Sequence, residues 1–150
     1  MGVMTVSVFC ILLTFLVTES FAVPGRKECN YGFSRPNPSW KSCYLLDQKL
    51  RSWSDAKELC LQKGGTLASI KNNEQLQYAY EMIPDGYFWV DGNYVSGFPQ
   101  NNWLPGSKPG GTNADCLTLV KFPAGRGFSD IACSEKIDSA YALCESYATY

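Results

Sequence analysis

The sequence predicts an extracellular α+β domain that is held together by disulfide bonds. An apolar leader precedes six further cysteines, which is the usage of a secreted protein. Two segments with helical spacing follow one another in the first half, and short β-prone segments separated by turn-rich stretches fill the second half. No repeat, second apolar segment or linker divides the chain after the leader, so we expect one domain from Val23 to Tyr150.

The segment from Met1 to Ala22 predicts a secretory signal peptide. An apolar run extends from Val6 to Val17, and the small residues that a signal peptidase needs flank a cleavage point before Val23. A membrane-spanning helix needs roughly 20 predominantly apolar residues, which is more than this run contains. We therefore expect cleavage, secretion and an extracellular location without membrane insertion, with an uncleaved anchor as the alternative.

Composition excludes several classes of function. The sequence has no histidine, which removes Ser-His-Asp and Cys-His nucleophile activation together with every His-ligated zinc site. Its acidic residues are scattered without a recognisable carboxylate pair, so we expect no enzyme activity. Once Glu19 leaves with the leader, 13 basic residues face 13 acidic ones, and this neutral balance argues against nucleic acid and anionic membranes as partners.

The first half of the mature chain predicts a hairpin and then a helix. Cys29 to Leu46 has a cysteine near each end and a turn-rich middle, as in a short stapled hairpin. Apolar residues then recur at helical spacing from Trp53, with Ser52 or Ser54 as the N-cap, until Gly64-Gly65 ends the helix. Cys60 lies on the apolar face of this helix.

The remainder predicts one more helix and then β-structure. Thr66 to Ile70 is β-prone, and Asn72 or Asn73 caps a second helix that ends before Pro84. Short strands are expected at residues 87–90, 116–120 and 141–144. The stretch between Asp91 and Asp115 has no helical period and is rich in glycine and proline, which is typical of a long functional loop.

Seven segments, taken together, resemble a C-type lectin-like domain. In order they are Cys43-Tyr44, SWSDAKELC (52–60), GGTLASI (64–70), FWVDG (88–92), ADCLTL (114–119), FSDIAC (128–133) and ALCE (142–145). The resemblance implies two helices flanking small antiparallel sheets, a long loop region and three disulfides. It implies the pairs Cys29–Cys43, Cys60–Cys144 and Cys116–Cys133.

The resemblance also implies where calcium and sugar bind in calcium-dependent members. A Glu-Pro-Asn or Gln-Pro-Asp loop motif, a glutamate and a Trp-Asn-Asp strand motif hold the ion there. In this chain the corresponding positions are Lys108-Pro109-Gly110, Ala114 and Phe128-Ser129-Asp130, so that only Asp130 keeps a carboxylate. Calcium takes about six to eight oxygen ligands, and the Lys108 ammonium repels it. We expect no calcium and no other cofactor, with a displaced site at Asn113 or Asp115 as the alternative.

Ligand contacts are expected in the same long loop. Tyr94 and Phe98 can stack on a ligand or pack internally, and Asn101 and Asn102 can donate amide hydrogen bonds or serve turns. Trp103 matches a buried anchor of the family's loop, so we expect it to pack in the core. Lys108 is either a solvated lysine or a bridge to Asp130 or Asp115 that replaces the ion.

These observations predict a secreted binding module for a glycan or an extracellular protein that works without calcium. The alternatives are a calcium-dependent sugar lectin and a structural extracellular protein associated with matrix, mineral or ice. Host defence, as part of innate immunity, is a common role of similar secreted domains. The six cysteines are expected to pair internally, which argues against a disulfide-linked dimer; the oligomeric state is otherwise undetermined.

Overall fold

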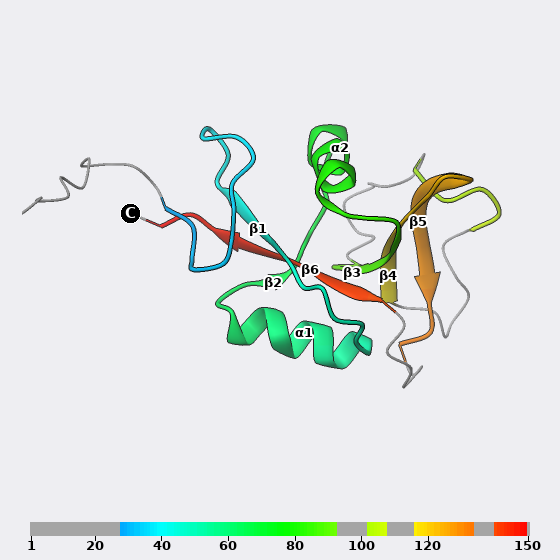
Figure 1. Ribbon diagram of the computed structural model, residues 1–150, viewed down its shortest axis with the longest axis horizontal. Helices are drawn as coiled ribbons and strands as arrows, with labels where there is room; N and C mark the ends of the chain where they lie inside the picture. Colours follow the sequence, from blue (N-terminus) through cyan, green and yellow to red (C-terminus); the bar gives the residue numbers. More distant parts are fainter. Residues whose placement is uncertain (1–27, 93–101, 108–115, 134–139, 150) are drawn as a thin grey trace, which may run out of the picture.

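The computed structural model describes residues 28–92, 102–107, 116–133 and 140–149 (Figure 1). The expected signal peptide lies outside these ranges, as does the start of the expected domain at Val23. Within them, no helix has the length and apolar character that crossing a lipid bilayer would require.

Helix α1 (Trp53–Gln62) begins and ends where its sequence predicts. The Ser52 hydroxyl accepts a hydrogen bond from the Asp55 backbone N–H at 3.2 Å, so Ser52 rather than Ser54 is the N-cap. The helix ends before Gly64, whose φ of +80° favours glycine. Cys60 is fully buried on the inner face, as predicted.

Helix α2 (Asn73–Met82) also has the predicted cap. The Asn72 side chain accepts from the Gln75 backbone N–H at 2.9 Å. Leu76 and Tyr80 lie on the buried face, and the extended backbone of Ile83 ends the helix immediately before Pro84.

Six strands form one sheet. They are β1 (Ser42–Leu46), β2 (Thr66–Leu67), β3 (Gly86–Val90), β4 (Cys116–Phe122), β5 (Gly125–Ile131) and β6 (Tyr141–Tyr147). The order is β1-β6-β3-β4-β5, with β2 also paired to β6. The β6 strand runs between the β1/β2 side and the β3–β5 side, as Figure 1 shows.

The sheet is antiparallel, as expected, except at the boundary between β3 and β6. Phe88 and Trp89 of β3 pair with Tyr141 and Ala142 of β6 in parallel register, whereas the other pairings are antiparallel. The three expected strands are present and longer than predicted, while β5 was not predicted. The stapled hairpin is represented by an antiparallel bridge between Ser34 and Tyr44.

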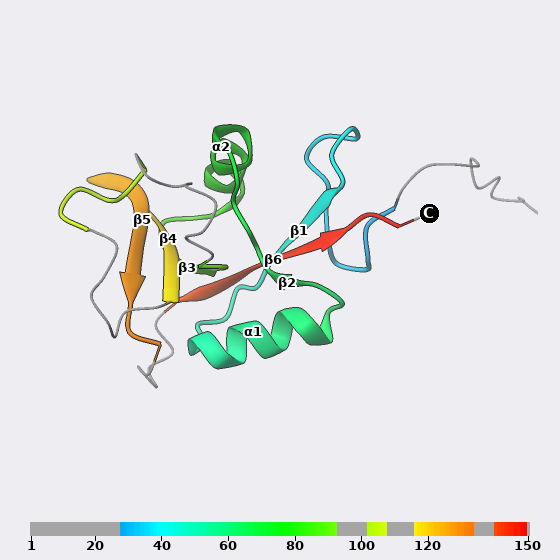
Figure 2. The same cartoon turned by 180° about the vertical axis from the view of Figure 1, so that it is seen from behind.

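The core consists of two clusters that lie on the α2 side and the α1 side of the central strands (Figures 1 and 2). Neighbouring residues of β3 belong to different clusters. Phe88 packs in the cluster with α2, and Trp89 packs in the cluster with α1. This is the alternation that a strand imposes on its side chains. Burial of each such large side chain contributes about 1.5–3 kcal/mol, so both helices are fixed by apolar packing.

The three disulfides have the pairing that the resemblance implies. Their Cα–Cα distances are 5.7 Å for Cys29–Cys43, 5.4 Å for Cys60–Cys144 and 5.2 Å for Cys116–Cys133. The second bond joins α1 to β6 across 84 residues of sequence. In the chain-entropy account, closing loops of this range stabilises a domain by about 3–5 kcal/mol each.

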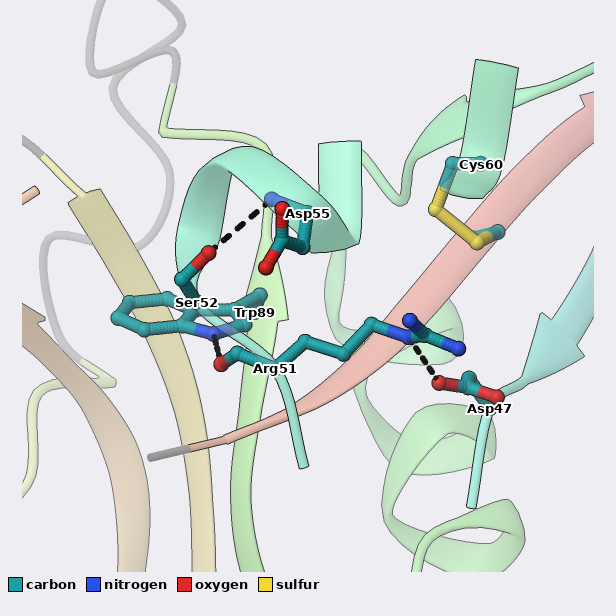
Figure 3. Close-up of polar contacts among 7 residues, drawn as sticks. Asp47, Arg51, Ser52, Asp55, Cys60 and Trp89 are labelled. Atoms are coloured by element: carbon teal, nitrogen blue, oxygen red, sulfur yellow. Dashed lines mark hydrogen bonds and ion pairs between the residues drawn. A yellow bond between two sulfur atoms is a disulfide. The ribbon is translucent and has the colours of Figure 1, made fainter. Parts of the chain in front are cut away.

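The connection from β1 to α1 is fixed by Arg51 (Figure 3). Its side-chain Nε donates to Asp47 Oδ2 at 2.6 Å, and its carbonyl accepts from the indole Nε1 of Trp89 at 2.9 Å. The buried Trp89 therefore has its polar atom satisfied and holds the start of α1 against the sheet.

Candidate functional site

The candidate site lies along β5, the strand at the end of the sheet order. Segment 102–107 runs beside this strand. The Phe128 N–H donates to the Asn102 carbonyl, and the Leu104 N–H donates to the Phe128 carbonyl, both at 2.8 Å. Trp103 forms a parallel bridge with Phe128. The segment thus covers backbone groups that an edge strand would otherwise expose.

Gly127 makes this close approach possible. A Cβ atom at that position would lie 2.3 Å from the Leu104 nitrogen and 2.7 Å from its Cα, far inside van der Waals contact. Gly125, two residues earlier on β5, has room for a methyl group, because the nearest atom is Leu104 Cδ1 at 3.6 Å. Space, and not backbone conformation, therefore requires glycine at position 127.

Trp103 and Phe128 anchor the site to the core. Phe128 is almost completely buried in the α2-side cluster, and Trp103 packs against that cluster while remaining partly exposed. Packing of Trp103 agrees with its expected role as a loop anchor. Phe128, the first residue of the strand motif, is a core residue.

The other two residues of the strand motif offer little to a cation. The Ser129 hydroxyl accepts from Ser107 Oγ at 3.2 Å, and its carbonyl accepts from Thr118 Oγ1 at 2.9 Å. Asp130 supplies one carboxylate, whose Oδ2 atom is buried and has no hydrogen-bond partner within the described ranges. A buried carboxylate oxygen normally has a hydrogen-bond partner. At this site, the Asp130 carboxylate can therefore accept a further hydrogen bond.

The described residues do not fit a calcium ion at this position. They provide one carboxylate and one hydroxyl that is already bonded, against about six to eight oxygens for calcium. Across residues 28–92, 102–107, 116–133 and 140–149, no three His, Cys, Asp or Glu side chains gather as a metal site would require.

The structure places two of the predicted contact residues and brings both to β5. Asn102 lies on the covering segment, and its side-chain amide donates to Asn73 Oδ1 on α2 at 3.5 Å. Asp130 lies on β5 itself. The remaining candidates lie outside the described residues: Tyr94, Phe98, Asn101, Lys108, Asn113 and Asp115.

Sequence reasoning missed a buried carboxylate on β6. Glu145 is only 4 % exposed, accepts a hydrogen bond from the Ser42 hydroxyl of β1, and accepts from the Ser69 N–H after β2 at 3.0 Å. Burial, and next the Glu145 carboxylate, raise the pKa of Tyr44 above its ordinary value. A charged residue directly after Cys144 in an apolar strand was the available signal.

Comparison with known proteins begins with a family model. The model for the lectin C-type domain matches residues 49–146. The human C-type mannose receptor 2 is 28% identical over 127 residues, which is 68% of this chain but 8% of the receptor. The chain therefore spans a small part of the first curated relatives that it matches.

Solved structures of similar fold come from proteins with different functions. A calcium-independent type II antifreeze protein has a TM-score of 0.63 at 21% identity, with 82% of this chain and 97% of that chain covered. The C-type lectin domain of murine dendritic cell inhibitory receptor 2, solved in complex with N-glycan, has a TM-score of 0.62 at 18% identity, with 80% and 99% covered. At such identity these likenesses establish the fold alone.

Proposed function

Because this chain belongs to the lectin C-type domain family, we propose that it is a secreted, non-enzymatic module that binds a glycan or an extracellular protein without calcium. Domains of this family are in general binding modules. The proposed binding surface consists of the loop from Tyr94 to Asp115, which includes the covering segment 102–107, together with β5.

The observation that supports the proposal is that the family's calcium position has few anionic ligands in this chain. Ser129 is bonded to Ser107, and Asp130 stands alone as a carboxylate on β5. In the sequence, a lysine, a glycine and an alanine occupy the other mapped positions, at 108, 110 and 114. A site of this composition has too few oxygen ligands to offset the free-energy cost of removing water from a divalent cation.

The contact residues of this site are proposed from their places in the sequence and from their chemistry. Tyr94 and Phe98 supply ring surfaces to a sugar face or an apolar partner. Asn101, Asn102 and Asn113 supply amide hydrogen bonds. Asp115 and Asp130 accept hydrogen bonds from ligand hydroxyl or ammonium groups.

Lys108 is the proposed partner of the buried Asp130 oxygen. An ammonium there satisfies the carboxylate and ties the loop to β5 in the place where relatives use an ion. We expect Lys108→Ala to make residues 102–115 more sensitive to limited proteolysis, whereas Lys63→Ala, after α1, leaves the cleavage pattern unchanged. An identical pattern in Lys108→Ala and wild type would show that Lys108 is a solvated lysine.

The test of the function is a glycan array with monosaccharide competition on the oxidised protein, run with calcium and again with excess chelator. Binding that survives chelation is expected. Binding that chelator abolishes would instead identify a calcium-dependent lectin and refute the calcium-free site. Absence of glycan binding, together with capture of an extracellular protein, would select the protein ligand; absence of both would favour a structural extracellular role.

Calorimetric titration provides an independent check. Calcium added into the low-millimolar range, where extracellular modules bind it, is expected to give no saturable heat. Tight saturable binding would show that the protein has a calcium site and would overturn the proposal, and loss of that binding in Asn113→Ala or Asp115→Ala would locate the displaced site.

A further inference from the structure

A second concave site is formed by elements other than those of the candidate binding surface. A cavity of about 610 Å³ lies between the connection after β1, the C-terminal end of α2, and the start of β6. This volume is in the range of small-molecule sites, roughly 300–1,000 Å³. None of its lining residues belongs to β5 or to segment 102–107.

An ordered aromatic pair lines this cavity. Phe88 and Tyr141 stack with ring centroids 5.3 Å apart and an interplanar angle of 29°. Gly86 lies against the Tyr141 ring as well, because a Cβ on Gly86 would be 3.3 Å from its Cε2 atom. Met82 and Ile83 add apolar surface from the end of α2. The ring of Tyr141 is thereby held in place before any ligand arrives, which lowers the entropy cost of binding.

The charged groups of the lining are acidic. Asp47 reaches the cavity from the connection after β1, and Glu81 reaches it from the last turn of α2. The last turn of α2 contains no basic residue of its own, but a lysine from β4 compensates the partial negative charge of the helix C-terminus. The site therefore combines aromatic surface with two carboxylates, of which only Glu81 lacks a cationic partner among the described residues.

The neighbouring cations are already engaged. Arg51 pairs with Asp47 through its Nε (Figure 3). The Lys121 ammonium donates to the carbonyls of Tyr80 and Ile83 at 2.7 and 2.9 Å, so this end of the helix is already neutralised. Glu81, by contrast, is exposed and accepts a hydrogen bond only from the neutral Gln77 amide among the described residues.

We propose that this cavity binds an organic cation with an apolar body, its ammonium group directed to Glu81 and its apolar part against Tyr141 and Met82. Attraction of cations to aromatic faces and to carboxylates is the shared chemistry. A free aromatic amine and a lysine side chain of a partner protein both have it. The proposal does not depend on the function assigned to the β5 surface.

The test is NMR titration of the ¹⁵N-labelled, oxidised protein with three probes of similar shape: benzylammonium, benzyl alcohol and benzoate. We expect saturable shifts of the amides of residues 46–48 and 81–83 with benzylammonium, weaker shifts with benzyl alcohol and none with benzoate. Equal responses to all three probes, or none to benzylammonium, would overturn the proposal. Titration with N-acetyl-lysine amide separates the two sources, because binding as strong as that of benzylammonium indicates a lysine side chain.

Two glutamates provide matched variants. Glu81 and Glu58 are both exposed helix residues, and each accepts from a glutamine one helical turn away, but only Glu81 lines the cavity. We expect Glu81→Gln to weaken benzylammonium binding about threefold, the scale of one exposed ion pair, and Glu58→Gln to leave it unchanged. The same affinity in Glu81→Gln and wild type would refute the assigned role of the carboxylate.

Discussion

The substitution Gly127→Ala should detach segment 102–107 from β5 while leaving the rest of the domain folded. The added methyl group would lie 2.3 Å from the Leu104 nitrogen, and backbone atoms on both sides leave no flexible side chain to move away. The two hydrogen bonds that join Phe128 to Asn102 and Leu104 cannot form at the required separation.

The expected cost follows from those two bonds. Each contributes about 0.5–1.5 kcal/mol net, so their loss lowers the free energy of unfolding by about 1–3 kcal/mol, with a further contribution from Trp103. A domain stable by about 5–15 kcal/mol survives such a loss. Urea denaturation gives the total, and amide hydrogen exchange at Leu104 and Phe128 locates it.

Gly125→Ala is the matched control on the same strand. Its methyl group would be 3.6 Å from Leu104 Cδ1, so stability and amide protection should stay close to those of the wild type. If Gly127→Ala also keeps wild-type stability and protection at Leu104 and Phe128, the segment is not seated on β5 as described. If it loses protection there but retains full ligand binding, the binding surface lies elsewhere.

Three other predictions concern the framework. Glu145→Gln should lower the free energy of unfolding by about 1.5–3 kcal/mol, because an amide leaves one of the two hydrogen-bond donors without an acceptor. Exposed Glu58→Gln is the control. Equal stability of Glu145→Gln and the wild type would mean that the desolvation cost of the carboxylate cancels its hydrogen bonds. Burial, only partly offset by Arg126, raises the pKa of Tyr80 from 10.0 to about 12, and that of Tyr44 shifts in the same direction. Because the folded pKa values exceed the unfolded ones, this contribution to stability should be complete below pH 10 and should decline as pH rises above it. The decline is up to about 1.4 kcal/mol per pH unit for each tyrosine. Urea melts of Tyr80→Phe should show a shallower decline with pH, and an unchanged slope would contradict the assignment. Reduction of the three disulfides should unfold the domain, as monitored by near-UV circular dichroism, and a native spectrum after complete reduction would disprove their structural role.

The elements that the sequence predicted well are those with local causes. The Ser52 and Asn72 caps accept from residues three positions ahead, and Gly64 and Pro84 mark helix ends through their own backbone restrictions. The disulfide pairing was predicted differently, through a resemblance carried by seven segments between Cys43 and Glu145.

The elements that the sequence did not predict depend on distant partners. Two glycines in β5, at positions 125 and 127, are typical of turns, and the need for Gly127 appears only when Leu104 packs against it. Likewise, Glu145 accepts from residues 103 and 76 positions away. Propensity and spacing contain no information about such contacts.

The attachment of segment 102–107 to β5 explains how the proposed calcium-free site would hold its shape. Two backbone hydrogen bonds, the Ser107–Ser129 pair and the packing of Trp103 fix the start of the loop to β5, and none of these contacts involves an ion. In the proposed site, this backbone attachment leaves a cation only one task, which is to satisfy the Asp130 carboxylate. That requirement needs one positive charge or a few hydrogen-bond donors, which a lysine or a ligand can supply. Under the proposed function, the β5 surface therefore favours ligands that donate hydrogen bonds or carry positive charge over ligands that depend on coordination to a metal.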